Sequence, residues 1–143
     1  MVQISDVYVV ESLLQSTEAF TNPLCWQEIE QAGFASVGYL AQIGLIEIML
    51  HTVSGITGGR LWLTLSDKHG RVHLQEPEPT GWLGRKYRCE EDRRLAGAMN
   101  QLRRAIVRQC HQREVQAHEQ AGAIRERIFS QLLFGGRGLQ TGD

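Results

Sequence analysis

The spacing of hydrophobic positions predicts three short helices in the first third of the chain. Apolar side chains recur at helical spacing over residues 4–15, although the run VYVV within them also fits a strand. A second helix is predicted over residues 22–33, where Pro23 takes the first helical position after residues that can cap it. A third is predicted over residues 36–44, since Gly44 ends the periodic pattern.

After Gly44 the period falls to two, which predicts strands. Residues 45–53 are rich in aliphatic and β-branched side chains, and residues 60–66 alternate leucines with other residues. Residues 67–70 have the composition of a turn, and residues 71–75 follow as a third strand. The middle of the chain therefore predicts a small antiparallel meander or hairpin.

The last part of the chain is predicted to be one long helical segment after a linker. Residues 77–89 contain two prolines and read as the linker, residues 90–134 as the helix, and residues 135–143 as a disordered tail. The apolar positions of the helix repeat every eleven residues, which suits a nearly straight helix of about 60 Å if it is unbroken. An unbroken helix would pair with the same helix of a second subunit. Alternatively, the helix would break near Gly122 and fold back as a hairpin. For the first outcome we expect a homodimer held by Leu95, Met99, Leu102, Ile106, Ile124, Ile128 and Leu132.

Short motifs in the predicted meander resemble those of a known fold. Leu40 is followed by GLIE at residues 44–47, then by Gly58-Gly59-Arg60, Trp62-Leu63-Thr64 and Gly70-Arg71. This order resembles the end of the recognition helix and the wing of small bacterial regulators of the PadR and MarR types. The resemblance covers about residues 20–74. It implies an α+β fold in which a winged-helix-like domain of three helices and a small antiparallel sheet, residues 1–76, precedes the long helix.

Charge is distributed unevenly along the chain. The first Lys or Arg is Arg60, and all fifteen basic residues lie from there on, whereas residues 1–59 hold six carboxylates. An acidic surface repels nucleic acid, and phosphate contacts supply most of the non-specific affinity of DNA-binding proteins. The predicted third helix offers no cation for a DNA groove. Nucleic-acid contact is therefore left to residues of the wing and linker, namely Arg60, Lys68, Arg71, Arg85, Lys86 and Arg88.

Residues that could carry catalysis or bind metal form no recognised pattern. The three cysteines are widely spaced and predict reduced, mostly packed thiols, with Cys25 on the apolar face of a helix. His111, Glu114 and His118 share a helix face, but zinc would need a fourth donor from elsewhere. We expect no cofactor, no metal and no enzymatic activity. No apolar run is long enough to cross a membrane, so we expect a cytoplasmic protein.

The charge distribution favours a non-enzymatic regulatory or adaptor protein that acts by protein–protein contact. One alternative is a winged-helix transcription regulator that binds DNA through the wing and linker cations, and a second is an enzyme of unrecognised type. The candidate protein-contact residues lie in the acidic half and at the linker anchor: Glu28, Glu30, Tyr39 and Trp82.

Overall fold

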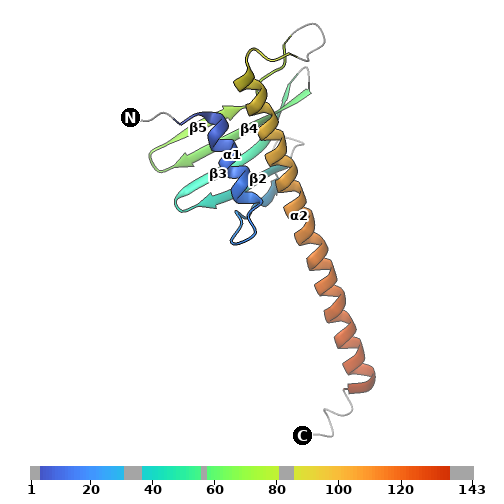
Figure 1. Ribbon diagram of the computed structural model, residues 1–143. Coiled ribbons are helices and arrows are strands. Elements are labelled where there is room, and N and C mark those ends of the chain that lie inside the picture. Colours follow the sequence, from blue (N-terminus) through green and yellow to red (C-terminus); the bar gives the residue numbers. More distant parts are fainter. Residues whose placement is uncertain (1–3, 31–36, 56–57, 81–85, 136–143) are drawn as a thin grey trace. The chain divides into compact units, whose positions relative to one another are not determined.

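The protein has an α+β fold, seen in a computed structural model that describes residues 4–30, 37–55, 58–80 and 86–135. Contacts divide the chain into two compact units, Met1–Cys110 and His111–Asp143, and the first is called the folded unit below. The elements are, in chain order, α1 (Asp6–Thr17), β1 (Gln27–Glu30), β2 (Val37–Ile43), β3 (Ile46–Gly55), β4 (Gly58–Asp67), β5 (Gly70–Gln75), α2 (Glu90–Ser130) and the π-helix η1 (Gln131–Gly135) (Figure 1).

The five strands form one antiparallel meander in which each strand pairs with its neighbour in sequence. Between β2 and β3 the chain reverses through Gly44 and Leu45, because Ile43 pairs with Ile46. Gly44 has a φ of +59°, a conformation that glycine adopts without strain at the first central position of a hairpin turn. Between β4 and β5 a carboxylate oxygen of Asp67 accepts the backbone N–H groups of His69 and Gly70.

One face of the sheet is covered by α1 and by the first part of α2 (Figure 1). Successive side chains of a strand point to opposite faces, so the register places every second residue of each strand under the helices. The strands contribute Ala41, Ile48, Leu50, Leu61, Leu63 and Leu74 to this core. The helices contribute Val7, Val10, Leu13, Leu95, Ala98, Met99, Leu102, Ile106 and Cys110.

Trp26 joins the two helices at the edge of the sheet. Its indole is fully buried, and the indole N–H donates to the hydroxyl of Thr17, which in turn donates to the carbonyl of Leu13. On the other side, the amide oxygen of Gln109 accepts the backbone N–H of Trp26, and its amide nitrogen donates to the carbonyl of Leu24, both at 2.8 Å. Gln109 therefore fixes the segment that leads into β1 against α2.

Two of the three predicted short helices are wrong. The first, over residues 4–15, is confirmed as α1, but residues 27–30 and 37–43 are strands. Asn22 has a φ of +53°, so the chain does not enter a helix at Pro23. The apolar residues of β2 fit a strand as well as a helix, and Gly44 suits a hairpin turn as well as the end of a helix. The three-helix arrangement of a winged-helix domain is therefore not supported.

The later elements follow the prediction more closely. The three predicted strands and the turn are confirmed as β3, β4 and β5. The long helix α2 runs through Gly122 without a break, so a hairpin does not form there. Division into compact units falls within α2, after Cys110, and not at the predicted linker over residues 77–89. The predicted tail lies outside the described residues except for Gly135, which ends η1.

We expect Gln109→Ala to destabilise the folded unit by about 2 kcal/mol, because it removes two hydrogen bonds and leaves the half-buried N–H of Trp26 unsatisfied. Urea unfolding followed by circular dichroism measures this change. Gln101→Ala is the matched control, since Gln101 is exposed on the same helix. Equal urea midpoints for the two variants would show that Gln109 does not hold the segment.

Candidate functional site

The sheet face opposite the helices carries an unusual set of side chains, and we call it the open sheet face. Both α-helices of the folded unit pack on the other face (Figure 1). The register of the strands places on the open sheet face Leu40, Met49, His51, Arg60, Trp62, Thr64, Arg71 and His73. Leu40, Met49 and Trp62 are half-buried there, so apolar surface is left accessible at the centre of a sheet.

Three rings form a row across β3, β4 and β5. The rings of His51 and Trp62 have centroids 6.4 Å apart, and those of Trp62 and His73 are 6.1 Å apart in an edge-on arrangement. His51 lies directly opposite Trp62 in the register, while His73 lies opposite Thr64. The Thr64 hydroxyl and Nδ1 of His73 are joined by a hydrogen bond of 3.1 Å, which fixes the imidazole beside the indole.

The surroundings of His51 disfavour its protonated form. Burial lowers the pKa of its imidazole below the ordinary value, and the nearby His73 lowers it further. Its Nδ1 atom is buried and has no hydrogen-bond partner in the described part of the chain. A positive charge on His51 would therefore be poorly solvated and uncompensated.

The predicted nucleic-acid residues are only partly brought together. Arg71 lies on the open sheet face next to Lys68 in the preceding turn, and Arg60 lies toward the opposite end of β4. The guanidinium of Arg60 also contacts the carboxylate of Glu78 at 3.1 Å. Arg88 pairs with Asp92 at 3.5 Å, at the start of α2. Lys86 pairs with Thr80 in an isolated β-bridge, and Arg85 lies outside the described residues.

The acidic residues of the first half lie mainly on the helix side of the sheet. Glu28 and Glu30 are exposed on the edge strand β1, and Glu28 lies opposite Tyr39. Burial raises the pKa of the Tyr39 phenol, and the charge of Glu28 raises it further. Glu47 of β3 lies on the open sheet face at the end that also carries Arg71, with Ser66 between them in the register. Trp82, the other predicted protein contact, lies outside the described residues.

The carboxylates of α1 pair with arginines of α2. Glu11 contacts Arg94 at 2.7 Å and Glu18 contacts Arg108 at 3.7 Å. Part of the negative charge of residues 1–59 is therefore balanced inside the folded unit. The acidic half is a weaker electrostatic surface than its sequence alone predicts.

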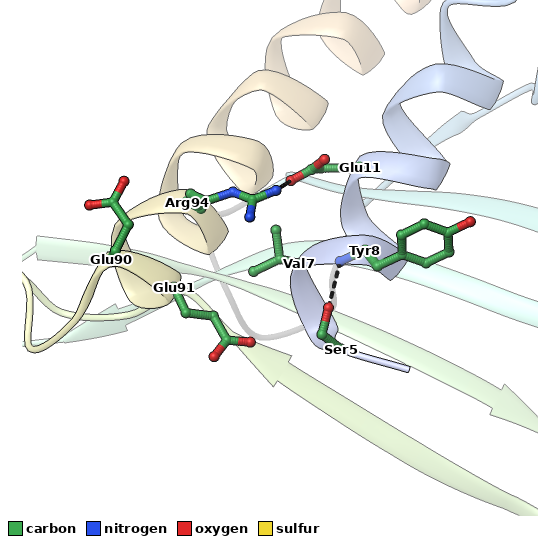
Figure 2. A pocket seen from close by; sticks show the side chains of 7 residues that line it. All are labelled: Ser5, Val7, Tyr8, Glu11, Glu90, Glu91 and Arg94. Atoms are coloured by element: carbon green, nitrogen blue, oxygen red, sulfur yellow. Dashed lines mark hydrogen bonds and ion pairs between the residues drawn. The ribbon is translucent and has the colours of Figure 1, made fainter. Parts of the chain in front are cut away.

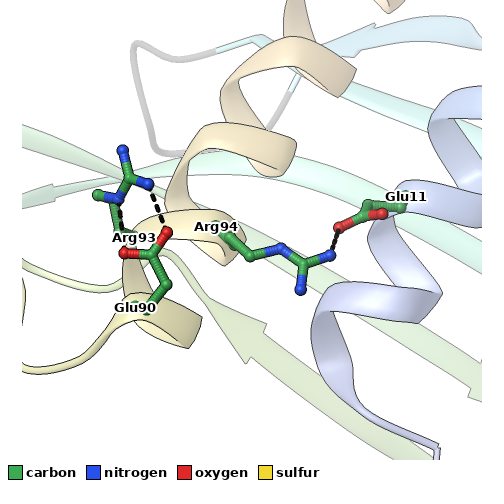
Figure 3. Close-up of polar contacts among 4 residues, drawn as sticks. All are labelled: Glu11, Glu90, Arg93 and Arg94. Carbon is green, nitrogen blue, oxygen red and sulfur yellow. Dashed lines mark hydrogen bonds and ion pairs between the residues drawn. The ribbon is translucent and has the colours of Figure 1, made fainter.

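A hollow lies between the first turns of α1 and α2 (Figure 2). Its wall includes Glu11, Glu90, Glu91 and Arg94. Arg94 contacts Glu11, and Arg93 contacts Glu90, which holds the pKa of the Glu90 carboxyl below its ordinary value (Figure 3). Three of the charged groups of the wall, Glu11, Glu90 and Arg94, are therefore already paired on an exposed surface, and the hollow offers a ligand little that the solvent does not.

The predicted dimer residues divide into two groups. Leu95, Met99, Leu102 and Ile106 are buried in the core of the folded unit, so they are not available to a second copy. The other three, Ile124, Ile128 and Leu132, are exposed in the second unit. Further apolar side chains that the predicted stripe omits are exposed beside them: Phe129, Leu133 and Phe134.

The described residues contain no group of three or more His, Cys, Asp or Glu side chains placed to hold a metal ion. His111, Glu114 and His118 are exposed along α2. Cys25 and Cys89 are exposed, so the prediction of mostly packed thiols is wrong, and Cys110 alone of the three is buried. Among the described helices, none is long and apolar enough to cross a membrane.

Sequence reasoning did not identify the ring row. The alternation in β4 places Trp62 and Thr64 on one face, but the sequence does not say which residues of β3 and β5 lie beside them. The available signal for His73 was the turn at residues 67–70, because loop length fixes register in a hairpin. A prediction built on that turn would have placed His73 on the face of Trp62.

We expect the free energy of unfolding to fall as the pH drops below about 6.5, because the unfolded chain binds a proton at His51 more readily than the folded one. His51→Gln should remove part of this slope. His73, Arg60 and Glu47 are titratable or charged groups on the same face, and all remain in the variant. Urea unfolding at a series of pH values measures the slope.

The control is His69→Gln, which changes an exposed histidine in the turn after β4. It should unfold with the pH dependence of the unaltered protein. If His51→Gln behaves in the same way as this control, burial of His51 does not oppose its protonation.

Comparisons of the chain with protein families, with curated proteins and with solved structures each found no match.

Proposed function

We propose that the protein is a non-enzymatic regulatory or adaptor protein that acts by protein–protein contact, and that its first partner is a second copy of the same chain. The observation that carries the proposal is the exposed apolar stripe on the second unit. Ile124, Ile128 and Leu132 are 51%, 55% and 74% exposed. Single apolar residues are ordinary on a protein surface, but a row of exposed apolar residues at helical spacing is typical of a helix that packs on another helix.

The spacing of the stripe supports a helical partner. Apolar or small residues occur at 117, 121, 124, 128 and 132, and this repeats the steps of four and three found at 95, 99, 102, 106 and 110. In the folded unit the first set packs on the sheet. The second set has the same eleven-residue period, which two nearly straight helices can share along their length.

Charges beside the stripe support an antiparallel pair. Glu114 and Arg125 are eleven residues apart, about three helical turns, so they lie on the same flank of the stripe. In an antiparallel pair that flank meets itself, and Glu114 of each copy lies beside Arg125 of the other. Two identical ion pairs result from the two-fold symmetry.

The alternative, a winged-helix transcription regulator, has less support. Strands occupy the positions of its second and third helices. Of the cations predicted for its wing, Arg60 lies near the start of β4 and Lys68 lies just after its end. They are eight residues or roughly 25 Å apart along a strand. A helix that enters a DNA groove with cations grouped around it finds no counterpart among the described residues.

We expect the unaltered protein to be a dimer at micromolar concentrations and the double variant Ile124→Glu with Ile128→Glu to be a monomer, because each copy would bury two carboxylates in the apolar contact. Light scattering coupled to size-exclusion chromatography measures the mass. The control adds two carboxylates on the opposite side of the same helix, Gln116→Glu with Ala123→Glu, and should stay dimeric. A monomeric unaltered protein would overturn the proposal.

The orientation has its own test. Glu114→Arg should weaken the dimer by placing like charges together twice, and Glu114→Arg combined with Arg125→Glu should restore most of the loss. Sedimentation equilibrium at low salt gives the dissociation constants, with an expected change of about three- to tenfold. Failure of the second substitution to restore affinity would contradict antiparallel pairing while leaving the dimer itself intact.

A further inference from the structure

We propose that the open sheet face binds a single-stranded nucleic acid, with bases stacked on the row of His51, Trp62 and His73 and phosphates beside Lys68 and Arg71. This site goes beyond the proposed self-association and uses none of its residues. Two independent features carry the inference, the ring row and the exposed cations beside it.

The ring row has the character of a stacking surface. Trp62 is half-buried at the centre of three strands, so its ring is held in place while part of it stays accessible. Aromatic side chains on an open antiparallel sheet accept unstacked bases, and this contact tolerates any sequence because every base has a π-face. The half-buried His51 adds a flat ring beside the indole.

Exposed cations beside the ring row can contact phosphates. Arg71 lies on the open sheet face two residues before His73, Lys68 is exposed in the turn before β5, and Arg60 lies two residues before Trp62, on the other side of the row. Since Arg60 already contacts Glu78, we assign the phosphate contacts to Lys68 and Arg71. Glu11 of α1, Glu18 just after it, and Glu28 and Glu30 on the helix side of β1 do not lie on the open sheet face. Glu47 does, opposite Ser66 with Arg71 on the other side of Ser66, so a bound strand would have to contact Arg71 on the side away from Glu47.

The ring row selects a single strand over a duplex. The described strands present a face on which neither α1 nor the first part of α2 packs (Figure 1). In a duplex the bases are paired and stacked on one another, so their faces are not available to the rings of this sheet face. Unpaired bases can instead lie on the rings while the backbone passes the cations.

The test uses the full chain and a fluorescein-labelled oligothymidylate of roughly 15 nucleotides, near the upper limit for one such platform. Fluorescence anisotropy at low salt should give a dissociation constant in the range of about 1–100 µM, as for other non-specific complexes. Trp62→Ala should weaken binding about tenfold or more, because one base loses its stacking partner. Arg71→Ala should weaken binding and reduce the slope of log affinity against log salt by about 0.7.

Arg104→Ala is the matched control, since it removes an exposed arginine of α2 and should leave both affinity and slope unchanged. Circular dichroism reports whether Trp62→Ala still folds. If it does not, Trp62→Phe, which keeps a ring, should retain binding, while Arg71→Ala still decides the phosphate contact.

Three results would overturn the inference. One is the absence of any anisotropy change at low salt. Another is equal loss in Arg71→Ala and Arg104→Ala, which would indicate general attraction to the surface. A third is equal competition by a duplex of the same length, which would favour the alternative function, binding of duplex DNA. The monomeric variant with Ile124→Glu and Ile128→Glu should still bind the oligonucleotide, so failure of self-association and failure of this site are distinguishable.

Discussion

The burial of one sheet face under α1 and the first part of α2 is the constraint on which the rest of the folded unit depends. It requires every second residue of the central strands to be apolar, and Ile48, Leu50, Leu61 and Leu63 meet this requirement. Because side chains alternate, the same constraint frees the intervening positions from the core. Trp62, His51 and His73 occupy these free positions, so their presence there needs an explanation other than packing against the helices.

The parts of the fold that the sequence predicts are those whose structure is determined locally. A period of two between residues 45 and 75, with a turn at residues 67–70, was enough to place β3, β4 and β5, and the long apolar stripe was enough to place α2. The failures are β1 and β2. The sequence VGYLAQI fits a helix and a strand equally well, and it becomes a strand because β3 lies beside it. Pairing between strands is a tertiary interaction, which local periodicity does not contain.

The candidate site was predicted in pieces for the same reason. Arg60 and Arg71 could be named from charge alone, but their common face depends on the registers of β4 with β3 and with β5. The acidic half could be named as well, but its pairing with Arg94 and Arg108 depends on the packing of α1 on α2. That pairing changes the meaning of the charge asymmetry. Part of the negative charge is balanced on the helix side, whereas on the open side Arg60 contacts Glu78 and Arg71 shares its end of the sheet with Glu47.

The eleven-residue stripe of α2 carries the strongest physical argument about what the chain does outside its folded unit. Up to Cys110 the stripe packs on a sheet, and this packing accounts for its residues. Beyond Cys110 the helix is rich in Gln, Glu, Arg and Ala, which favour helix without tertiary contacts. Solubility alone would place polar residues at 124, 128 and 132. Their occupation by Ile, Ile and Leu is explained when the second half of the helix, like the first, has an apolar surface to pack against.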